Sequence, residues 1–156
     1  MARSLARSKG RRESGTFAAI PHAVMDSEDF RALSGGALKV LLGLLRQYRG
    51  ANNGDLSASF TQAKQWGMNS RTTLAKALDE LQARDLIVRT REGRFIKPGG
   101  CCALYAITWR PIDPCDEKIE VSPTATAPRK FSLERVKNPV QKVDALRPEN
   151  GLMEAC

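Results

Sequence analysis

Apolar residues recur at helical spacing in the segment SGGALKVLLGLLRQYRG, residues 34–50. Four of them follow the i, i+3, i+4, i+7 pattern of one helix face: Leu38, Leu41, Leu42 and Leu45. Ser34 is a suitable N-cap and Gly50 a suitable stop, so the pattern predicts a helix between them. Because so much of its surface is apolar, we expect this helix at the centre of a hydrophobic core.

Two further helices are predicted at residues 60–67 and 70–84. The buried stripe of the second is expected to consist of Leu74, Ala77, Leu78 and Leu81. Only Gly67-Met68-Asn69 joins the two helices, and a connection this short makes them cross steeply, as in a helix-turn-helix. The second helix would then be held out from the domain by the first.

Alternating apolar and polar residues predict three short strands. Leu56 and Ala58 alternate with polar residues after an Asn-Asn-Gly turn, which suits a short edge strand. The segments LIVRT (86–90) and CALYAITW (102–109) suit two paired strands. The basic segment REGRFIKPGG between them suits the tip of a hairpin.

The composition changes towards both ends of the 156-residue chain. Residues 1–16 are basic, small and polar, and are expected to form a flexible arm. Residues 17–112 hold the predicted helices and strands and are expected to form one domain. Six of the eight prolines lie at or after Pro111, which predicts a mostly disordered tail over residues 113–156. Spaced apolar residues at 130–146 leave two interpretations open, a segment that binds a protein partner and an incidental pattern.

The chain is basic, with a formal net charge of +8 and a pI of about 9.7. Residues 1–16 hold five basic residues and one acidic residue, whereas residues 113–156 hold seven basic and eight acidic residues. The excess therefore lies in the arm and the domain. It favours a nucleic acid as partner, with an anionic membrane surface and an inert basic surface as the alternatives.

The sequence shows no pattern typical of an enzyme or a metal protein. His22 is the single histidine, so no Ser-His-Asp or Cys-His set is apparent, and no Gly-rich phosphate loop occurs. The cysteines at 101, 102, 115 and 156 form no C-x-x-C pair, which favours reduced thiols over a zinc site. We therefore expect no catalysis, cofactor or metal. No apolar run has the length of a membrane span or a signal peptide, so the expected location is the cytoplasm.

Small polar and basic side chains gather at the start of the helix predicted at 70–84. They are Asn69, Ser70, Arg71, Thr72, Thr73 and Lys76. In a helix-turn-helix, the residues at this end of the second helix enter the major groove. Arg71 would pair with guanine or phosphate, Asn69 with adenine, and the others with bases or phosphates. A solvated helix face would have the same composition, so this helix alone does not decide between the two interpretations.

Basic residues also gather in the hairpin loop and in the arm. The loop carries Arg89, Arg91, Arg94 and Lys97 around Gly93, with Glu92 as its one acid. A hairpin this basic beside a presented helix suits contact with the DNA backbone or minor groove, and a solvated tip is the alternative. The candidate phosphate contacts in the arm are Arg3, Arg7, Lys9, Arg11 and Arg12.

The stretch from Phe60 to Thr90 resembles the winged helix-turn-helix of bacterial transcription regulators. The residues that carry the resemblance are Gly67, Met68, Ser70-Arg71, Thr73-Leu74, Ala77-Leu78, Leu81 and Leu86-Ile87. The chain departs from the family pattern at Asn69, which is an extra residue in the turn, and at Asp85, where the family usually has glycine. That position tends to need the left-handed conformation, which Asp tolerates better than most residues.

The segments IPHAVMDS, GLLRQYRGANNG and LYAITWRPID extend the resemblance to winged-helix proteins of phages and plasmids, some of which initiate replication. The resemblance implies a mainly α domain with a small β-hairpin wing that binds double-stranded DNA. The implied role is transcription regulation or replication initiation on a mobile element, and a homodimer is left open. The alternative is a winged-helix module that binds protein, such as a phage-encoded inhibitor or adaptor. RNA ranks third, since no aromatic stacking platform is apparent.

Overall fold

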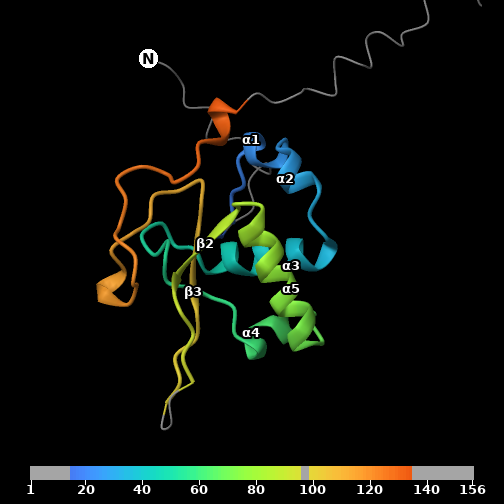
Figure 1. Ribbon diagram of the computed structural model, residues 1–156. Helices are drawn as coiled ribbons and strands as arrows, with labels where there is room; N and C mark the ends of the chain where they lie inside the picture. The colour runs from blue at the N-terminus through green and yellow to red at the C-terminus, as the bar shows by residue number, and fades with distance from the viewer. Residues whose placement is uncertain (1–14, 96–98, 135–156) are drawn as a thin grey trace, which may run out of the picture.

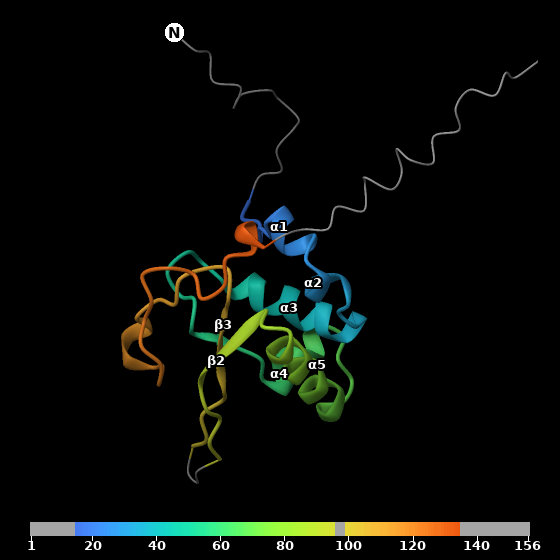
Figure 2. The same ribbon diagram turned by 45° about the horizontal axis from the view of Figure 1, so that its top comes forward.

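The computed structural model describes residues 15–95 and 99–134, which form a small mixed α/β domain. Its α-helices are α1 (His22–Met25), α2 (Glu28–Arg31), α3 (Gly35–Gln47), α4 (Phe60–Gln65) and α5 (Arg71–Ala83). Its strands are β1 (Leu56–Ser57), β2 (Ile87–Arg91) and β3 (Leu104–Ile107), followed by the 3₁₀ turns η2 (Cys115–Glu117) and η3 (Phe131–Leu133). Helices α3 and α5 pack together beside the sheet, and the β2–β3 hairpin projects away from α1 (Figures 1 and 2).

Helix α3 begins where its cap was predicted, but it is rotated relative to the predicted stripe. The Ser34 side chain accepts a hydrogen bond from the Ala37 amide and so caps the helix. The buried face consists of Ala37, Val40, Leu41, Gly43, Leu44 and Leu45. Leu42, predicted to be buried, is 46% exposed. The helix is apolar on several sides, so the periodicity did not determine which side would face α5 and the sheet.

The α4–α5 connection is a compact turn that closes on itself. Gly67 has φ +82°, and its amide donates to the Lys64 carbonyl while the Met68 amide donates to the Ala63 carbonyl. This pair of bonds is a Schellman motif, which requires the left-handed residue that glycine supplies at lowest cost. The Met68 side chain is 3% exposed and joins the core. The short connection predicted from the sequence is therefore anchored at its centre.

Helix α5 ends in a second Schellman motif, with Asp85 in the left-handed position. Asp85 has φ +52°, its amide donates to the Gln82 carbonyl, and the Leu86 amide donates to the Leu81 carbonyl. The left-handed conformation expected for Asp85 is confirmed. The stripe predicted for this helix is also confirmed, since Leu74, Ala77, Leu78 and Leu81 are its buried residues.

The sheet is antiparallel with the strand order β1-β3-β2, so β1 lies at an edge as expected. Leu56 pairs with Tyr105, and Ile87 pairs with Ile107 at the base of the hairpin. These four side chains point to one face and enter the same hydrophobic core as α3 and α5. A bridge between Arg94 and Cys101 extends the hairpin beyond the regular strands.

The expectation of a disordered tail from residue 113 is wrong for residues 113–134. The Glu120 amide donates to the Thr90 carbonyl, and the Arg129 amide donates to the Thr108 carbonyl. Phe131 is 3% exposed and lies edge-on to Trp109, with ring centroids 6.2 Å apart. A proline-rich segment forms little secondary structure of its own, but here its polar groups bond to the domain and one aromatic ring completes the core. We call residues 113–134 the strap; the rest of the predicted tail lies outside the described residues.

Arg129 fixes the end of the strap to two helices. Its guanidinium donates to the Arg84 carbonyl (2.8 Å) at the end of α5 and to the Asp29 carboxylate (2.8 Å) in α2. It also pairs with Glu134 at 2.7 Å and lies over the Phe131 ring, 4.1 Å from the centroid. Hydrogen bonding by Glu134 and Asp29 raises the pKa of Arg129, so the group stays charged. Its side chain is only 14% exposed, which makes this a largely buried anchor.

Candidate nucleic-acid interface

The start of α5 is exposed to solvent, as the sequence predicted. Asn69, Arg71, Thr72, Thr73 and Lys76 are all exposed, and Ser70 is half-buried. Ser70 occupies the N-cap position, but its side chain makes no capping hydrogen bond. The helix therefore presents a surface of hydroxyl, amide and cationic groups at its positive end.

Phe60 organises two cations beside this surface. The Arg71 guanidinium carbon lies 5.3 Å from the Phe60 ring centroid, and Lys64 Nζ lies 5.0 Å from it. Phe60 begins α4, whose capping box between Ser59 and Gln62 fixes its first turn. Lys64 thus joins the charge of α4 to that of α5.

Lys39 of α3 adds a third cation near the same turn. Its Nζ lies 3.5 Å from the point that a Cβ on Gly67 would occupy, and the residue is exposed. Neither Lys39 nor Lys64 was predicted as a site residue. The i, i+4 spacing of Phe60 and Lys64 could have identified Lys64. No local pattern links Lys39 to the turn, because the contact joins helices distant in sequence.

The acidic residues of α5 lie away from the exposed surface at the start of the helix. Glu80 accepts hydrogen bonds from the Ser34 amide (2.8 Å) and the Ser34 hydroxyl (2.6 Å) at the start of α3. These bonds hold the pKa of Glu80 below its ordinary value, and Arg84 lowers it further. Asp79 is exposed, but it lies two turns from Arg71. The first two turns of α5 therefore contain basic residues and no acid.

The arginines of the hairpin form hydrogen bonds and ion pairs within the chain, which the sequence did not predict. Arg89 pairs with Glu92 at 3.0 Å, and this hydrogen bond raises the pKa of Arg89. Arg91 is half-buried and donates to the Cys102 carbonyl at 2.9 Å. Arg94 pairs with Glu120 at 2.8 Å, although its side chain remains 60% exposed. Arg91 and Arg94 therefore both have partners within the chain and are not simply solvated.

The strap supplies the acid that holds the hairpin. Glu120 accepts from Arg94 through one carboxylate oxygen and from the Glu92 amide (3.2 Å) through the other. Its own amide donates to the Thr90 carbonyl at 2.7 Å. These three bonds attach the strap to the end of β2 and to the hairpin beyond it, so the strap supplies the counter-charge of a hairpin arginine.

The start of α5 and the hairpin lie at the same end of the domain. In Figures 1 and 2, α4, the start of α5 and the projecting hairpin are at the end opposite α1 and η3. The fold thus places the start of α5 and the hairpin at one end of the domain, and Lys39 and Lys64 lie beside the α4–α5 turn. The five predicted arm residues and Lys97 lie outside the described residues.

The remaining chemical groups of the described residues are unremarkable. Cys101, Cys102 and Cys115 are free thiols, and burial raises the pKa of Cys115. No cluster of three or more His, Cys, Asp or Glu suited to a metal occurs among residues 15–95 and 99–134. Within the same residues, every helix is too short or too polar to span a membrane.

Comparison with protein-family models, curated proteins and solved structures gives no match.

Proposed function

We propose that this chain is a winged helix-turn-helix protein that binds double-stranded DNA. The observation that carries the proposal is the joint exposure of the α5 start and a basic hairpin at one end of the domain. Helix α5 would enter the major groove, and the hairpin would act as the wing against the backbone or the minor groove. The proposed role is transcription regulation or replication initiation on a phage or plasmid.

Some of these side chains would recognise bases and others would bind phosphates. Arg71 and Asn69 lie at the exposed helix start, where their planar groups suit guanine and adenine edges. Lys64 and Lys39 lie beside the α4–α5 turn and Lys76 lies in the second turn of α5. These point charges suit phosphates, which position the protein without reading sequence. The Phe60 ring beneath Arg71 would limit the motion of the guanidinium before binding.

The test is fluorescence anisotropy on labelled duplexes, using a site selected from random DNA. We expect Arg71→Ala to lower specific affinity by about 1–3 kcal/mol and to relax specificity. Lys76→Ala should weaken all duplexes similarly and reduce the salt slope. Arg31→Ala is the matched control, because Arg31 is exposed in α2 at the opposite end of the domain. Failure of the wild-type chain to bind any duplex at low salt would refute the proposal.

A winged-helix module that binds protein is the second candidate. It is favoured by the pairing of hairpin arginines with acids of the same chain, which lowers the charge available to DNA. Salt separates the two candidates, because binding through several phosphates weakens steeply as salt rises. A protein-binding module would show no duplex binding even at low salt.

A further inference from the structure

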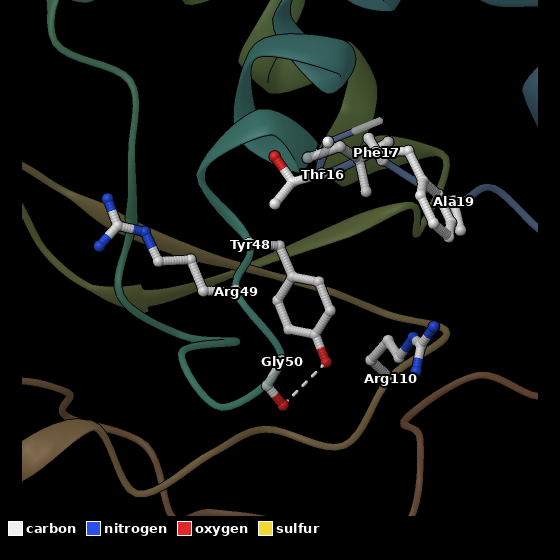
Figure 3. Close-up of a pocket in the computed structure, with 10 residues that line it drawn as sticks. Thr16, Phe17, Ala19, Tyr48, Arg49, Gly50 and Arg110 are labelled. Carbon is white, nitrogen blue, oxygen red and sulfur yellow. Dashed lines mark hydrogen bonds between the residues drawn. The ribbon is translucent and has the colours of Figure 1, made fainter. Parts of the chain in front are cut away.

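A pocket of about 440 Å³ lies where the first described residues meet the end of α3. Residues 15–19 form one wall, Leu45, Tyr48 and Arg49 another, and Arg110 closes a side. A neighbouring pocket of about 350 Å³ shares several of these residues and adds Arg46. Figure 3 shows the Tyr48 ring in the middle, with Arg110 on one side and Arg49 on the other. None of these residues belongs to the proposed duplex-binding surface.

Among the described residues that line this pocket and its neighbour, every charged side chain is an arginine. Arg46, Arg49 and Arg110 are exposed, and none of them forms an ion pair with another described residue. No acidic residue lines either pocket. The contrast with Arg89, Arg94 and Arg129, which all have carboxylate partners, is clear. Three arginines around the pockets without an ion-pair partner among the described residues suit an anionic ligand.

The pocket also contains two aromatic rings. The Tyr48 hydroxyl donates to the Gly50 carbonyl at 3.1 Å, which fixes the orientation of the ring. The Arg110 guanidinium carbon lies 5.6 Å from the Tyr48 centroid. Phe17 is 87% exposed, so the fold leaves almost its whole ring in water. Planar faces beside guanidinium groups suit a ligand that has planar apolar groups as well as negative charge.

We propose that this pocket binds single-stranded nucleic acid, with bases stacked on Phe17 and Tyr48 and phosphates paired with Arg46, Arg49 and Arg110. Aromatic faces combined with a positive groove are what sequence-tolerant single-strand sites use. In a duplex the bases already stack on one another, so Phe17 would have no free base face to contact. An acidic peptide would satisfy the arginines but would leave the aromatic rings unused. The site goes beyond the proposed duplex-binding function and does not depend on it.

The experiment measures binding of the full chain to a fluorescein-labelled 15-nucleotide oligo-dT by anisotropy at low salt. We expect the wild type to bind and Phe17→Ala to lose about fivefold or more in affinity, the value of one stacked base. The double variant Arg49→Ala/Arg110→Ala should bind more weakly and with a shallower salt dependence. Phe17 is almost fully exposed, so its truncation should leave the melting temperature unchanged.

Two controls keep this test separate from that of duplex binding. Arg31→Ala removes an exposed arginine elsewhere and should bind oligo-dT as the wild type does. Arg71→Ala should retain oligo-dT binding while losing specific duplex binding.

Wild-type affinity in Phe17→Ala, or no oligo-dT binding by the wild type, would overturn the inference. Equal competition by poly-glutamate would also overturn it, in favour of a site for acidic protein. Loss of oligo-dT binding in Arg71→Ala would assign the single strand to α5 instead.

Discussion

At the scale of single residues, Asp85 shows how a departure from the expected glycine is tolerated. Its φ of +52° ends α5 in a Schellman motif, and its carboxylate lies near the negative end of the helix. Asp85→Gly should raise stability by roughly 0.5–1 kcal/mol. Glycine removes the free-energy cost of about 1–2 kcal/mol that an L-residue pays in the left-handed conformation. It also loses more backbone entropy on folding, which offsets part of that gain. The measurement is urea unfolding at pH 7, and unchanged or lower stability would contradict it.

Glu80 is the residue that links stability to acidic pH. Its two hydrogen bonds from Ser34 lower its pKa in the folded state. Its stabilising contribution is therefore full above the ordinary glutamate pKa of 4.5, and is lost as pH falls through the lower folded value. Glu80→Gln should cost about 1 kcal/mol at pH 7 and flatten the acid dependence of the melting temperature.

Asp79→Asn is the matched control for that experiment. It removes the same charge from the preceding residue of α5, but Asp79 forms no ion pair with another described residue. Thermal melting of both variants between pH 3 and pH 7 compares them. Similar curves for the two variants would show that the Ser34 contact contributes nothing specific.

At the scale of elements, Gly43 sets the approach of α3 to the end of α4. A Cβ at Gly43 would lie 2.3 Å from two ring atoms of Trp66. Replacing an interior helix glycine by alanine normally stabilises by about 1 kcal/mol. Here Gly43→Ala should instead destabilise by about 1–3 kcal/mol, because the indole must leave its packed position.

Gly36→Ala in the same helix is the control for Gly43→Ala. Its Cβ would make only ordinary contacts, the nearest being Met68 Cε at 3.8 Å. We expect Gly36→Ala to stabilise the protein modestly, so the two substitutions should have opposite signs in thermal or urea unfolding. Equal effects would contradict the close packing of α3 on Trp66.

Local sequence patterns predicted the elements whose determinants are local. The Ser34 cap and the buried stripe of α5 depend on residues within a few positions of one another. The left-handed Asp85 was expected from the resemblance to the winged helix-turn-helix pattern. The Asn-Asn-Gly segment was recognised only as a turn. In the structure, the buried Asn53 side chain bonds to backbone groups of Ile107, Arg110 and Pro111. That role depends on tertiary contacts, so no local pattern contains it.

In the candidate sites, too, only the features that depend on local sequence were predictable. The exposed start of α5 was predictable because a helix with one apolar stripe has a defined opposite face. Lys39 and Glu120 were not, because each reaches its neighbours from a segment distant in sequence. The pocket of Phe17 and Tyr48 was also missed, since its two rings come from separate segments that only the fold brings together.

At the scale of the whole molecule, the strap is part of the folded unit. Phe131 is the strap residue most deeply buried in the core, where it packs on Trp109 and beneath Arg129. Phe131→Ala should destabilise by about 3–5 kcal/mol, the usual cost of a buried aromatic truncation. Leu133→Ala is the control, because Leu133 is 76% exposed and should lose less than about 0.5 kcal/mol. Equal unfolding midpoints for the two variants would show that the strap does not stabilise the domain.

The strap also connects the stability of the fold to the charge of the proposed wing. Glu120 neutralises Arg94 while its backbone holds β2, so one residue both supports the hairpin and reduces its attraction for phosphate. Glu120→Gln removes the charge and retains an oxygen that can accept from the Glu92 amide. The hairpin should therefore keep its position with a freer Arg94.

We expect Glu120→Gln to tighten duplex binding at low salt by roughly twofold to fivefold. An exposed ion pair such as Arg94–Glu120 contributes at most about 1 kcal/mol, which sets the upper limit of the effect. High salt should reduce the difference, because screening weakens the charge that the substitution exposes.

Glu117→Gln removes the same charge from the strap, and Glu117 forms no ion pair with another described residue, so it controls for net charge. Anisotropy titrations of the three proteins at two salt concentrations compare them. Equal tightening by both variants would indicate a general charge effect. No tightening by Glu120→Gln would mean that Arg94 does not face the DNA, and the hairpin would then have to be removed from the proposed interface.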